Sequence, residues 1–494
     1  MAARRAARYS ASMPNHPDSH RVVFDPVLIN RYDRAGPRYT SYPTAVQFHE
    51  NFGEAEYRAA ALASNVGHAP LSLYFHLPFC DTVCYYCACN KIVTRNRKHT
   101  APYLEHLFRE IELQGALFDR SRPVEQLHWG GGTPTFLSSD EMRALMHKTR
   151  THFNLRDDDR GEYSIEVDPR EANAGTIALL RELGFNRLSL GVQDFDPTVQ
   201  KAVNRIQSEA ETFAVLDAAR RTGFRSINMD LIYGLPHQTV ASFATTLDKV
   251  IAAGPDRLSV FNYAHLPELF KTQRQIDAAS LPAADEKLAI LQHTIEHLTA
   301  AGYVYIGMDH FARPDDELAV AQREGSLYRN FQGYSTHADC DLVAMGITAI
   351  GALQGSSRAT SAAGAGAAQA ISCYSQNVKT LDEYATLLDA GRLPVFRGIV
   401  LSDDDKLRRA IITQLICHFE VNFARIEQVH RIRFRDYFAA ELEECKAMQA
   451  DGLLDVHADS LNVRPAGKLL IRNICMVFDT YLRAAHKQRF SKVI

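Results

Sequence analysis

Four cysteines lie close together near the start of the chain. Cys80, Cys84 and Cys87 have the spacing Cys-x3-Cys-x2-Cys, and Cys89 follows two residues later. Three thiolates on one loop can bind three irons of a four-iron cluster and leave the fourth iron open to chelate the amino and carboxylate groups of S-adenosylmethionine. An electron passed to the sulfonium then breaks a carbon–sulfur bond and gives methionine and a 5′-deoxyadenosyl radical. The spacing therefore indicates radical chemistry.

Two other kinds of metal site could use these thiols. Structural zinc usually takes two separated pairs of ligands, whereas these cysteines crowd one loop. An electron-transfer cluster would need Cys89 as a fourth ligand, but only one residue separates it from Cys87, and ferredoxin spacings differ. The motif favours the radical cofactor over both. The other five cysteines are scattered, and we expect most to be small buried hydrophobic residues.

The bulk composition is that of an ordinary globular protein. The chain has 494 residues, of which 46% are hydrophobic and 23% charged, with a formal net charge of −3. This argues against disorder and against a surface that coats nucleic acid. No apolar run approaches the roughly 20 residues that a membrane helix needs. Residues 1–21 are basic and lack an apolar segment, so they are not a secretory signal, and we expect the cytoplasm.

A strand–helix unit recurs through the first two thirds of the chain. Helix-like stretches end at Gly184, Gly223, Gly254 and Gly302, and a short apolar strand follows each. Earlier strands are expected at 71–77, 126–129 and 163–167. Near-continuous apolar strands are typical of a parallel sheet that is covered on both faces. About six units precede residue 310, fewer than an eight-fold barrel needs, so the pattern predicts a partial barrel.

Polar and glycine residues stand where these strands end. In parallel α/β folds the chemistry is found at the carboxyl ends of the strands. Besides the cysteines, these ends carry Gly130–Gly132, Glu166, Asp168, Gln193, Asp230, Ala264 and His310. Three adjacent glycines let a backbone approach a ligand closely, and we interpret them as a ligand contact. Tyr86, directly before Cys87, is placed to lie against an adenine ring.

Long strings of residues give a specific resemblance. GPRYTSYPTA (36–45), CYYCACNKIVTR (84–95), HWGGGTPT (128–135), IEVDPRE (165–171) and RNFQGY (329–334) resemble the oxygen-independent coproporphyrinogen III oxidases, which are radical S-adenosylmethionine (SAM) enzymes. The resemblance runs from about residue 24 to the end. It implies oxidative decarboxylation of the propionates on rings A and B of coproporphyrinogen III to vinyl groups, which gives protoporphyrinogen IX. It also implies hydrogen abstraction from the propionate β-carbon by the deoxyadenosyl radical.

The resemblance also implies an organisation and partners. The fold would be an α/β radical SAM partial (β/α)6 barrel over 56–354, with an N-terminal tail and substrate-site segment over 1–55. A flexible Gly/Ala/Ser-rich insertion is expected over 355–375 and a mainly helical C-terminal domain over 376–494, with a short strand pair in 453–464. The chain would be a monomer whose cluster is reduced by a flavodoxin-like or ferredoxin-like donor, and the electron released as each vinyl group forms would go to an unidentified acceptor.

Site residues follow from the resemblance position by position. Cys80, Cys84 and Cys87 match the ligands of a [4Fe–4S] cluster, and the family binds two SAM molecules per chain. The positions around the first SAM are matched by Tyr74, Gly131, Glu166 and Ile350, with Phe331 and Gln332 close by. The positions around the second are matched by Tyr86, Gly132, Thr133, Gln193, Arg205, Asp230 and Ala264.

Cys89 and Tyr86 are the expected participants in catalysis. Related proteins on the same fold bind or deliver haem without making protoporphyrinogen, and they generally lack Cys89 and the GPRYTSYPTA segment. Both features are present, which favours the oxidase over this alternative. The substrate carries four carboxylates, so basic residues should line its site, and the candidates are Arg38, Arg313 and Arg329.

Overall fold

A computed structural model describes residues 21–32, 34–355 and 371–484. The first 20 residues of the expected N-terminal tail and most of the expected insertion at 355–375 lie outside these ranges. No described helix is both long enough and apolar enough to cross a membrane.

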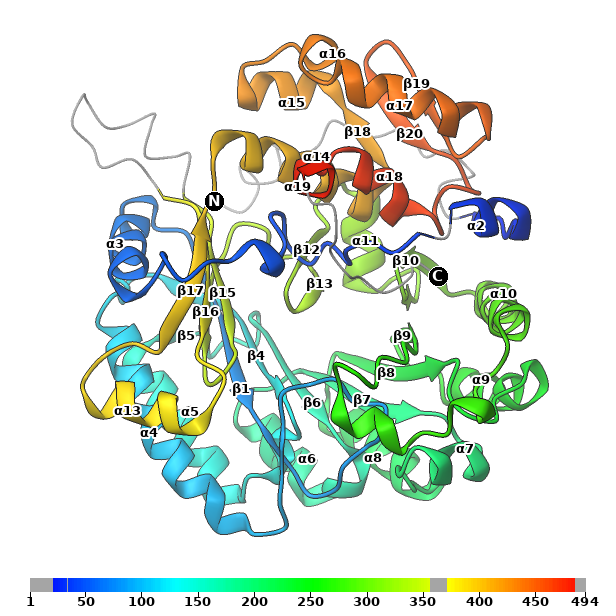
Figure 1. The fold of residues 1–494 in the computed structure, drawn as a ribbon. Coiled ribbons are helices and arrows are strands. Elements are labelled where there is room, and N and C mark those ends of the chain that lie inside the picture. The colour runs from blue at the N-terminus through cyan, green and yellow to red at the C-terminus, as the bar shows by residue number, and fades with distance from the viewer. Residues whose placement is uncertain (1–20, 33, 356–370, 485–494) are drawn as a thin grey trace.

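Six parallel strands form the centre of the molecule. They are β1 (Leu71–Leu77), β4 (Pro123–Gly131), β6 (Glu162–Val167), β7 (Arg187–Gln193), β8 (Ser226–Tyr233) and β9 (Arg257–Asn262), and they pair in that order. The helices between them lie on the outside of the curved sheet (Figure 1): α4 (Thr100–Gly115), α5 (Ser139–His152), α6 (Ala174–Glu182), α8 (Glu209–Thr222) and α9 (Val240–Ala253), with α10 (Ala284–Ala300) after β9. The predicted partial (β/α)6 barrel is confirmed.

Local sequence explains where these helices begin and end. Ser138, Ser208 and Thr239 accept backbone hydrogen bonds at the starts of α5, α8 and α9, and each forms a capping box with the residue three positions later. Gly223 and Gly254 end α8 and α9 in the left-handed conformation that glycine adopts without strain. The repeating unit is therefore specified locally, and the parallel strands follow from it.

One edge of the sheet departs from the repeat. After α10 the chain forms β10 (Val304–Gly307), turns through Met308 in a left-handed conformation, and returns as β11 (His310–Ala312). β11 lies between β9 and β10 and is antiparallel to both. The stretch after Gly302 was expected to supply one strand of the repeat, and it supplies a hairpin instead. The hairpin brings Asp309 and His310 to the mouth of the barrel.

The other edge extends the sheet beyond the expected barrel. β14 (Asp341–Met345) is parallel to β1, and then β15 (Ile350–Leu353), β16 (Cys373–Asn377) and β17 (Val395–Val400) pair in antiparallel fashion. The main sheet thus continues to Val400, whereas the C-terminal domain was expected from residue 376. These strands are four to six residues long and lie near the Gly/Ala/Ser-rich stretch, so they show too little periodicity to be detected in the sequence.

The C-terminal domain follows β17 and lies over the mouth of the barrel (Figure 1). Its main helices are α14 (Asp403–His418), α15 (Phe423–His430), α17 (Ala439–Ala450) and α18 (Ile471–Val477), followed by the short α19 (Thr480–Ala484). The strand pair predicted in 453–464 is confirmed as β19 (Leu454–Val456) and β20 (Ser460–Val463), with β18 (Glu420–Asn422) as a third strand.

The N-terminal segment is held by this C-terminal domain. In α2 (Pro26–Tyr32), the Tyr32 hydroxyl donates to Asp451 at 2.6 Å, and further along the Tyr39 hydroxyl donates to Asp479 at 2.9 Å. The segment then crosses toward β17, where His49 pairs with Gly398. Residues 34–50 therefore lie between the C-terminal domain and the barrel mouth.

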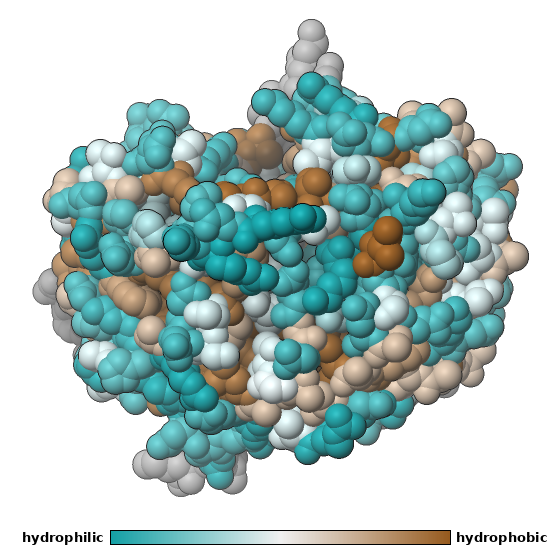
Figure 2. All heavy atoms as spheres, turned by 90° about the horizontal axis from the view of Figure 1, so that it is seen from below, coloured by the Kyte–Doolittle hydropathy of each residue, from teal (hydrophilic) through white to brown (hydrophobic). Residues whose placement is uncertain are grey.

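The face seen from below carries the outer helices and their loops. Figure 2 shows hydrophilic residues across the centre of this face and hydrophobic residues in small separate groups. Large exposed hydrophobic side chains such as Val93, Ile206 and Leu269 come from three different segments. Such scattered residues are normal for a protein surface.

Candidate radical cofactor site

A cavity of about 440 Å³ lies at the carboxyl ends of the parallel strands. It contains the four clustered cysteines together with most of the predicted cofactor-binding residues. Those that line it are Cys80, Cys84, Tyr86, Cys87, Cys89, Gly131, Gly132, Thr133, Glu166, Gln193, Arg205, Asp230 and Gln332. Residues separated by about 250 positions in the chain are thus brought to one place by the curvature of the sheet.

The cysteine loop is surrounded by hydrogen-bond donors. Guanidinium nitrogens of Arg170 and Arg205 lie 3.8 Å and 3.6 Å from the Cys84 sulfur, and the Thr133 hydroxyl lies 3.6 Å from the Cys80 sulfur. Positive charge and N–H or O–H donors stabilise thiolates over thiols. Within the described parts of the chain, no three His, Cys, Asp or Glu side chains converge on a single metal ion.

Cys87 and Cys89 influence each other directly. A hydrogen bond from Cys89, aided by the nearby Lys91 ammonium, lowers the pKa of the Cys87 thiol, and the pKa of Cys89 is raised in turn. Lys91 also donates to the Cys87 carbonyl oxygen at 2.9 Å, which holds the end of the loop. Cys89 is exposed to solvent, whereas Cys84 in the same loop is buried.

The glycine-rich turn packs against the cysteine loop. The Gly132 and Thr133 amides donate to the carbonyls of Leu77 and Phe79 at 2.8 Å and 2.7 Å. A Cβ atom on Gly132 would lie 2.6 Å from the Phe79 carbonyl oxygen. The space that glycine leaves here is thus filled by the protein itself. The interpretation of this turn as a ligand contact stays a prediction, and its structural role is to seat the loop.

Glu166 faces the cavity from the end of β6. Burial raises its pKa, but the hydrogen bond and positive charge of His128 and the amide of Gly131 outweigh burial, so the pKa lies below its ordinary value. The Gly131 amide donates to Glu166 at 3.1 Å. An ionised carboxylate at this position can accept hydrogen bonds from hydroxyl groups of a ligand.

Arg205 is paired within the protein. Its guanidinium group donates to Asp168 at 2.9 Å and to the Gly191 carbonyl at 2.5 Å, while its buried Nε atom has no hydrogen-bond partner among the described residues. Arg170 donates to the same Asp168 carboxylate at 2.7 Å. Burial raises the pKa of Asp168, but the two guanidinium groups outweigh it and bring the pKa to about 2. Asp168 therefore keeps a negative charge between the two arginines.

Asp230 lies across the cavity at the end of β8. Burial raises its pKa to about 6, and the charge of Glu166 adds to that effect against the hydrogen bond from Ser189. Ser189 and Asn228 each donate to its carboxylate at 2.8 Å. Gln193, on neighbouring β7, has a left-handed backbone with φ of 68°, a conformation that non-glycine residues adopt mainly at functional or strained positions.

Three predicted SAM residues lie beside this cavity. Tyr74, Phe331 and Ile350 pack together against an apolar cluster that includes Phe48 and Tyr374. Tyr74 stacks on His128 with ring centroids 5.8 Å apart. Their roles in cofactor binding stay predictions, and the structure places them behind the residues that line the cavity.

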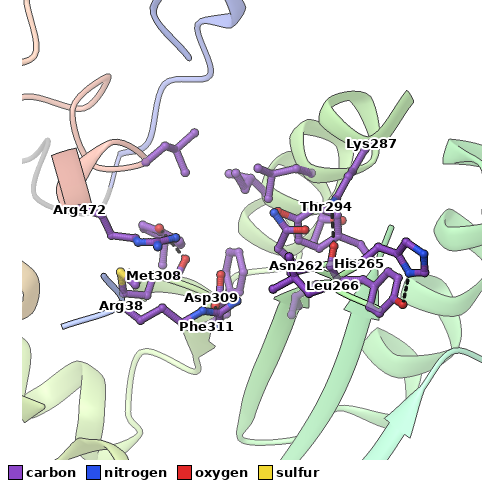
Figure 3. A pocket seen from close by; sticks show the side chains of 18 residues that line it. Arg38, Asn262, His265, Leu266, Lys287, Thr294, Met308, Asp309, Phe311 and Arg472 are labelled. Carbon is purple, nitrogen blue, oxygen red and sulfur yellow. Dashed lines mark hydrogen bonds and ion pairs between the residues drawn. The ribbon is translucent and has the colours of Figure 1, made fainter. Parts of the chain in front are cut away.

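A second cavity of about 300 Å³ lies on the opposite face of β8 and β9 (Figure 3). Ile232 and Phe261 line the first cavity, whereas Tyr233 and Val260 line the second, because successive strand side chains point to opposite faces. The predicted SAM residue Ala264 lines this second cavity.

The three candidate substrate arginines have different surroundings. Arg38 lies in the second cavity, 3.4 Å from the Asp309 carboxylate (Figure 3). Arg313 is turned away from both cavities and donates to the carbonyls of Gly254 and Pro255, where it holds the end of α9. Arg329 lies beside the first cavity: it lines a small neighbouring pocket with Tyr42, and its guanidinium carbon is 4.8 Å from the centre of the Tyr334 ring, which lines the first cavity.

Two family models match the chain. The model of the radical SAM superfamily matches residues 74–250, which begin in β1 and end in α9. The model of the HemN C-terminal domain matches residues 401–470, which begin directly after β17 ends at Val400. The two matches correspond to the barrel and to the domain above its mouth.

Similar proteins cover almost the whole chain. The oxygen-independent coproporphyrinogen III oxidase of Pseudomonas aeruginosa is 55% identical over 473 residues, which are 96% of this chain and 99% of that protein. The oxidase of Escherichia coli is 51% identical over 474 residues, with the same coverage. A solved structure of coproporphyrinogen III oxidase (HemN) from Escherichia coli, described as a radical SAM enzyme, superimposes with a TM-score of 0.86 at 49% identity and covers 93% of this chain and all of that one. The chain belongs to the oxygen-independent coproporphyrinogen III oxidase family.

The donor set of the cysteine loop fits the iron–sulfur cluster of this radical SAM family. Soft thiolates are the preferred ligands of such clusters, and their sulfurs are commonly hydrogen-bonded by the protein. Cys80, Cys84 and Cys87 would bind the irons, and Arg170, Arg205 and Thr133 already direct donors at two of these sulfurs. The cavity beside them offers room for SAM.

Sequence reasoning missed two contributors to this site in the oxidase. Arg170 lies beside Cys84 and shares Asp168 with Arg205, and His128 holds Glu166 in its ionised form. Both residues belong to strings that carried the resemblance, IEVDPRE and HWGGGTPT, so a signal was present. The contacts of Arg170 with Cys84 and of His128 with Glu166 could not be read from the sequence because each joins different strands or loops.

Proposed function

We propose that this chain catalyses the oxygen-independent oxidative decarboxylation of coproporphyrinogen III to protoporphyrinogen IX in haem biosynthesis. Two relatives that align with this chain over 99% of their own length are named as that oxidase. The observation that carries the proposal is the cysteine loop, which opens into a polar strand-end cavity together with the residues expected to bind SAM.

The [4Fe–4S] cluster and SAM together would supply the 5′-deoxyadenosyl radical when bound. The chain's own residues hold the reactants in place. Cys80, Cys84 and Cys87 fix three irons, and the Thr133 and Arg205 donors reduce the negative charge on the sulfurs.

Two SAM molecules per chain are part of this proposal. Glu166 and Gly131 stand on β6 and β4 and would contact the first molecule, whereas Gln193, Arg205 and Asp230 stand across the cavity and would contact the second. Ionised Glu166 and Asp230 can accept hydrogen bonds from ribose hydroxyls. The unpartnered Nε of Arg205 can donate to a methionyl carboxylate.

The electrons need a donor and an acceptor. Each propionate loses one hydrogen atom from its β-carbon, releases carbon dioxide and gives up one further electron as the vinyl group forms. The loop after the cysteines carries exposed Arg95, Arg97 and Lys98, with no acidic residue between Asp81 and Glu105. This basic stretch suits an acidic flavodoxin-like or ferredoxin-like donor. The acceptor is not identified by any feature of the chain. We further propose a cytoplasmic monomer.

The test is an anaerobic assay of the reconstituted chain. The protein is loaded with iron and sulfide and incubated with coproporphyrinogen III, SAM and a reductant. We expect both 5′-deoxyadenosine and protoporphyrinogen IX, and neither from Cys84→Ala. Absence of both products from the wild type, together with tight stoichiometric haem binding, would instead support a haem-binding or haem-delivery protein on the same fold.

A further inference from the structure

The hairpin that covers the cavity contains hydrogen-bond donors without acceptors. It is formed by β12 (Tyr328–Asn330) and β13 (Gly333–Ser335). The buried Nε and Nη1 atoms of Arg329 and the buried Nε2 atom of Gln332 have no hydrogen-bond partner among the described residues. All three are N–H donors, so what they lack is an acceptor.

The hairpin holds Arg329 in a fixed position. Arg329 is directly opposite Tyr334 in the strand pair, and the guanidinium group lies over the Tyr334 ring. The Tyr334 hydroxyl donates to the Ile416 carbonyl of α14 at 3.1 Å, which fixes the ring to the C-terminal domain. Tyr334 and Gln332 both line the 440 Å³ cavity. The cation therefore lies in a small adjoining pocket, against a ring that lines the cavity with the cysteine loop.

The charge of Arg329 is not balanced nearby. No carboxylate of the described chain forms an ion pair with Arg329. The carboxylates of Asp309 and Asp316 pair with Arg38 and Arg257 instead. The effect is visible at His310, whose ring meets the Tyr334 ring edge-on at 5.2 Å. Burial, and then the charges of Arg329, Arg257 and Arg38, lower the pKa of His310 to about 3. This side of the cavity is a region of excess positive charge.

We propose that Arg329 binds a carboxylate of the tetracarboxylic substrate. A buried guanidinium group is normally paired, and its planar donors match the two oxygens of a carboxylate. The inference rests on the proposed function for the identity of the ligand. A methionyl carboxylate of SAM offers the same chemistry, so the test must separate the two sources.

The first measurement compares Arg329→Lys, Arg329→Met and the wild type in the reconstituted enzyme. The KM for coproporphyrinogen III should rise about 10- to 100-fold in Arg329→Met and less in Arg329→Lys, which keeps the charge but not the two parallel donors. The dissociation constant for SAM and the electron paramagnetic resonance spectrum of the cluster should not change. Arg313→Met removes an equivalent side chain outside both cavities and should leave the KM unchanged.

The second measurement does not depend on turnover. Fluorescence titration should give weaker binding of coproporphyrin III, the oxidised form of the substrate, to Arg329→Met, while its tetramethyl ester should bind both proteins equally weakly. Equal coproporphyrin affinity for wild type and Arg329→Met would overturn the proposal, as would a loss of SAM affinity alone. If the wild type makes no protoporphyrinogen IX, the proposed function fails, and the titration still decides whether Arg329 binds a porphyrin carboxylate.

Stability separates a binding role from a structural one. A guanidinium group without a carboxylate partner among the described residues contributes no ion pair to folding, so Arg329→Met should melt within about 1 °C of the wild type without ligand or slightly above it. A clear fall in the melting temperature would instead mean that Arg329 is needed for the fold, and would contradict the proposal.

Discussion

The two sides of the cavity treat buried guanidinium groups in opposite ways. On the cysteine-loop side, Arg205 and Arg170 share the Asp168 carboxylate, and Arg205 also donates to a backbone carbonyl. On the hairpin side, Arg329 has two buried nitrogens without an acceptor among the described residues. The charge of the guanidinium group is balanced by a carboxylate on the cysteine-loop side, and no described carboxylate balances it on the hairpin side.

This difference separates a prebuilt cofactor site from a site that awaits its ligand. The paired side supports a cluster loop that must keep its shape while the cofactor is loaded, so its charges are balanced by the protein. On the hairpin side, the charge of Arg329 would be balanced by a ligand that binds and leaves during turnover. Substitutions on the two sides should therefore affect stability very differently.

The largest effect should come from removing the shared carboxylate. Asp168→Ala leaves two guanidinium groups, one of them buried beside Cys84, without their counter-charge. Breaking a buried ion pair in this way costs about 3–5 kcal/mol of unfolding free energy. Chemical denaturation at pH 7 measures this cost, and iron analysis after reconstitution measures the expected loss of the cluster.

The matched control is Asp389→Ala, which removes a carboxylate from an exposed surface pair with Arg109. It should shift the denaturation midpoint only slightly, because exposed pairs contribute little. Equal effects of the two substitutions would remove the basis for calling the cysteine-loop side internally balanced.

A second prediction concerns the seat of the cysteine loop. In Gly132→Ala the new Cβ atom would meet the Pro78 and Phe79 backbone at 2.6 Å, so the loop must move. Overpacking of this kind costs about 1–3 kcal/mol, and the displaced cysteines should also bind less iron.

Gly175→Ala provides the comparison for this second substitution. Gly175 lies in the first turn of α6, where alanine is a better helix former and the nearest contact is the Asn173 side chain. We expect unchanged stability and full iron content. Full iron content in Gly132→Ala would contradict the role of this glycine in seating the cysteine loop. It would favour the ligand contact that the sequence indicates.

The sequence predicted the features that depend on the position of a residue within its own strand. The strand at 71–77 is a near-continuous apolar run, and β1 has those bounds in the structure. Glu166, Gln193 and Asp230 lie in the C-terminal halves of their strands, and the cysteine loop begins soon after β1. The rule that strand ends meet at one edge was therefore enough to group them in one cavity.

Other features depend on partners that are distant in sequence. Arg313 and Arg329 were equivalent candidates in the sequence. Arg313 follows the β10–β11 hairpin and holds the end of α9, whereas Arg329 lies in the β12–β13 hairpin next to the cavity. The extension of the sheet to Val400 was missed for a similar reason, since β15 and β16 are separated by a long Gly/Ala/Ser-rich stretch.

A third prediction uses the raised pKa of Asp230. The folded state binds its proton more tightly than the unfolded state, whose Asp pKa is about 3.9, so stability falls as pH rises from about 4 to about 6. Asp230→Asn removes this cost and should be more stable than the wild type by on the order of 1–2 kcal/mol at pH 7.5. Denaturation curves at pH 7.5 and pH 4 check this, and the gain should vanish at the lower pH.

The same substitution should weaken SAM binding, because an amide is a poorer acceptor for ribose hydroxyls than a carboxylate. A stability gain with reduced SAM affinity would place Asp230 among residues that are costly for folding and useful for binding. A gain that persists unchanged at pH 4 would show that the raised pKa is not its source.

The smallest effect is expected at Cys89. Its side chain is exposed, and its contact with Cys87 is a single hydrogen bond that a serine hydroxyl can replace. If three cysteines bind the cluster, Cys89→Ser should reconstitute with the same iron content as the wild type and still produce 5′-deoxyadenosine, while Cys87→Ser should lose iron. Loss of iron from Cys89→Ser to the same extent would make Cys89 a fourth ligand. A cluster bound by four cysteines has no open iron for SAM, so that single result would contradict the radical mechanism at its first step.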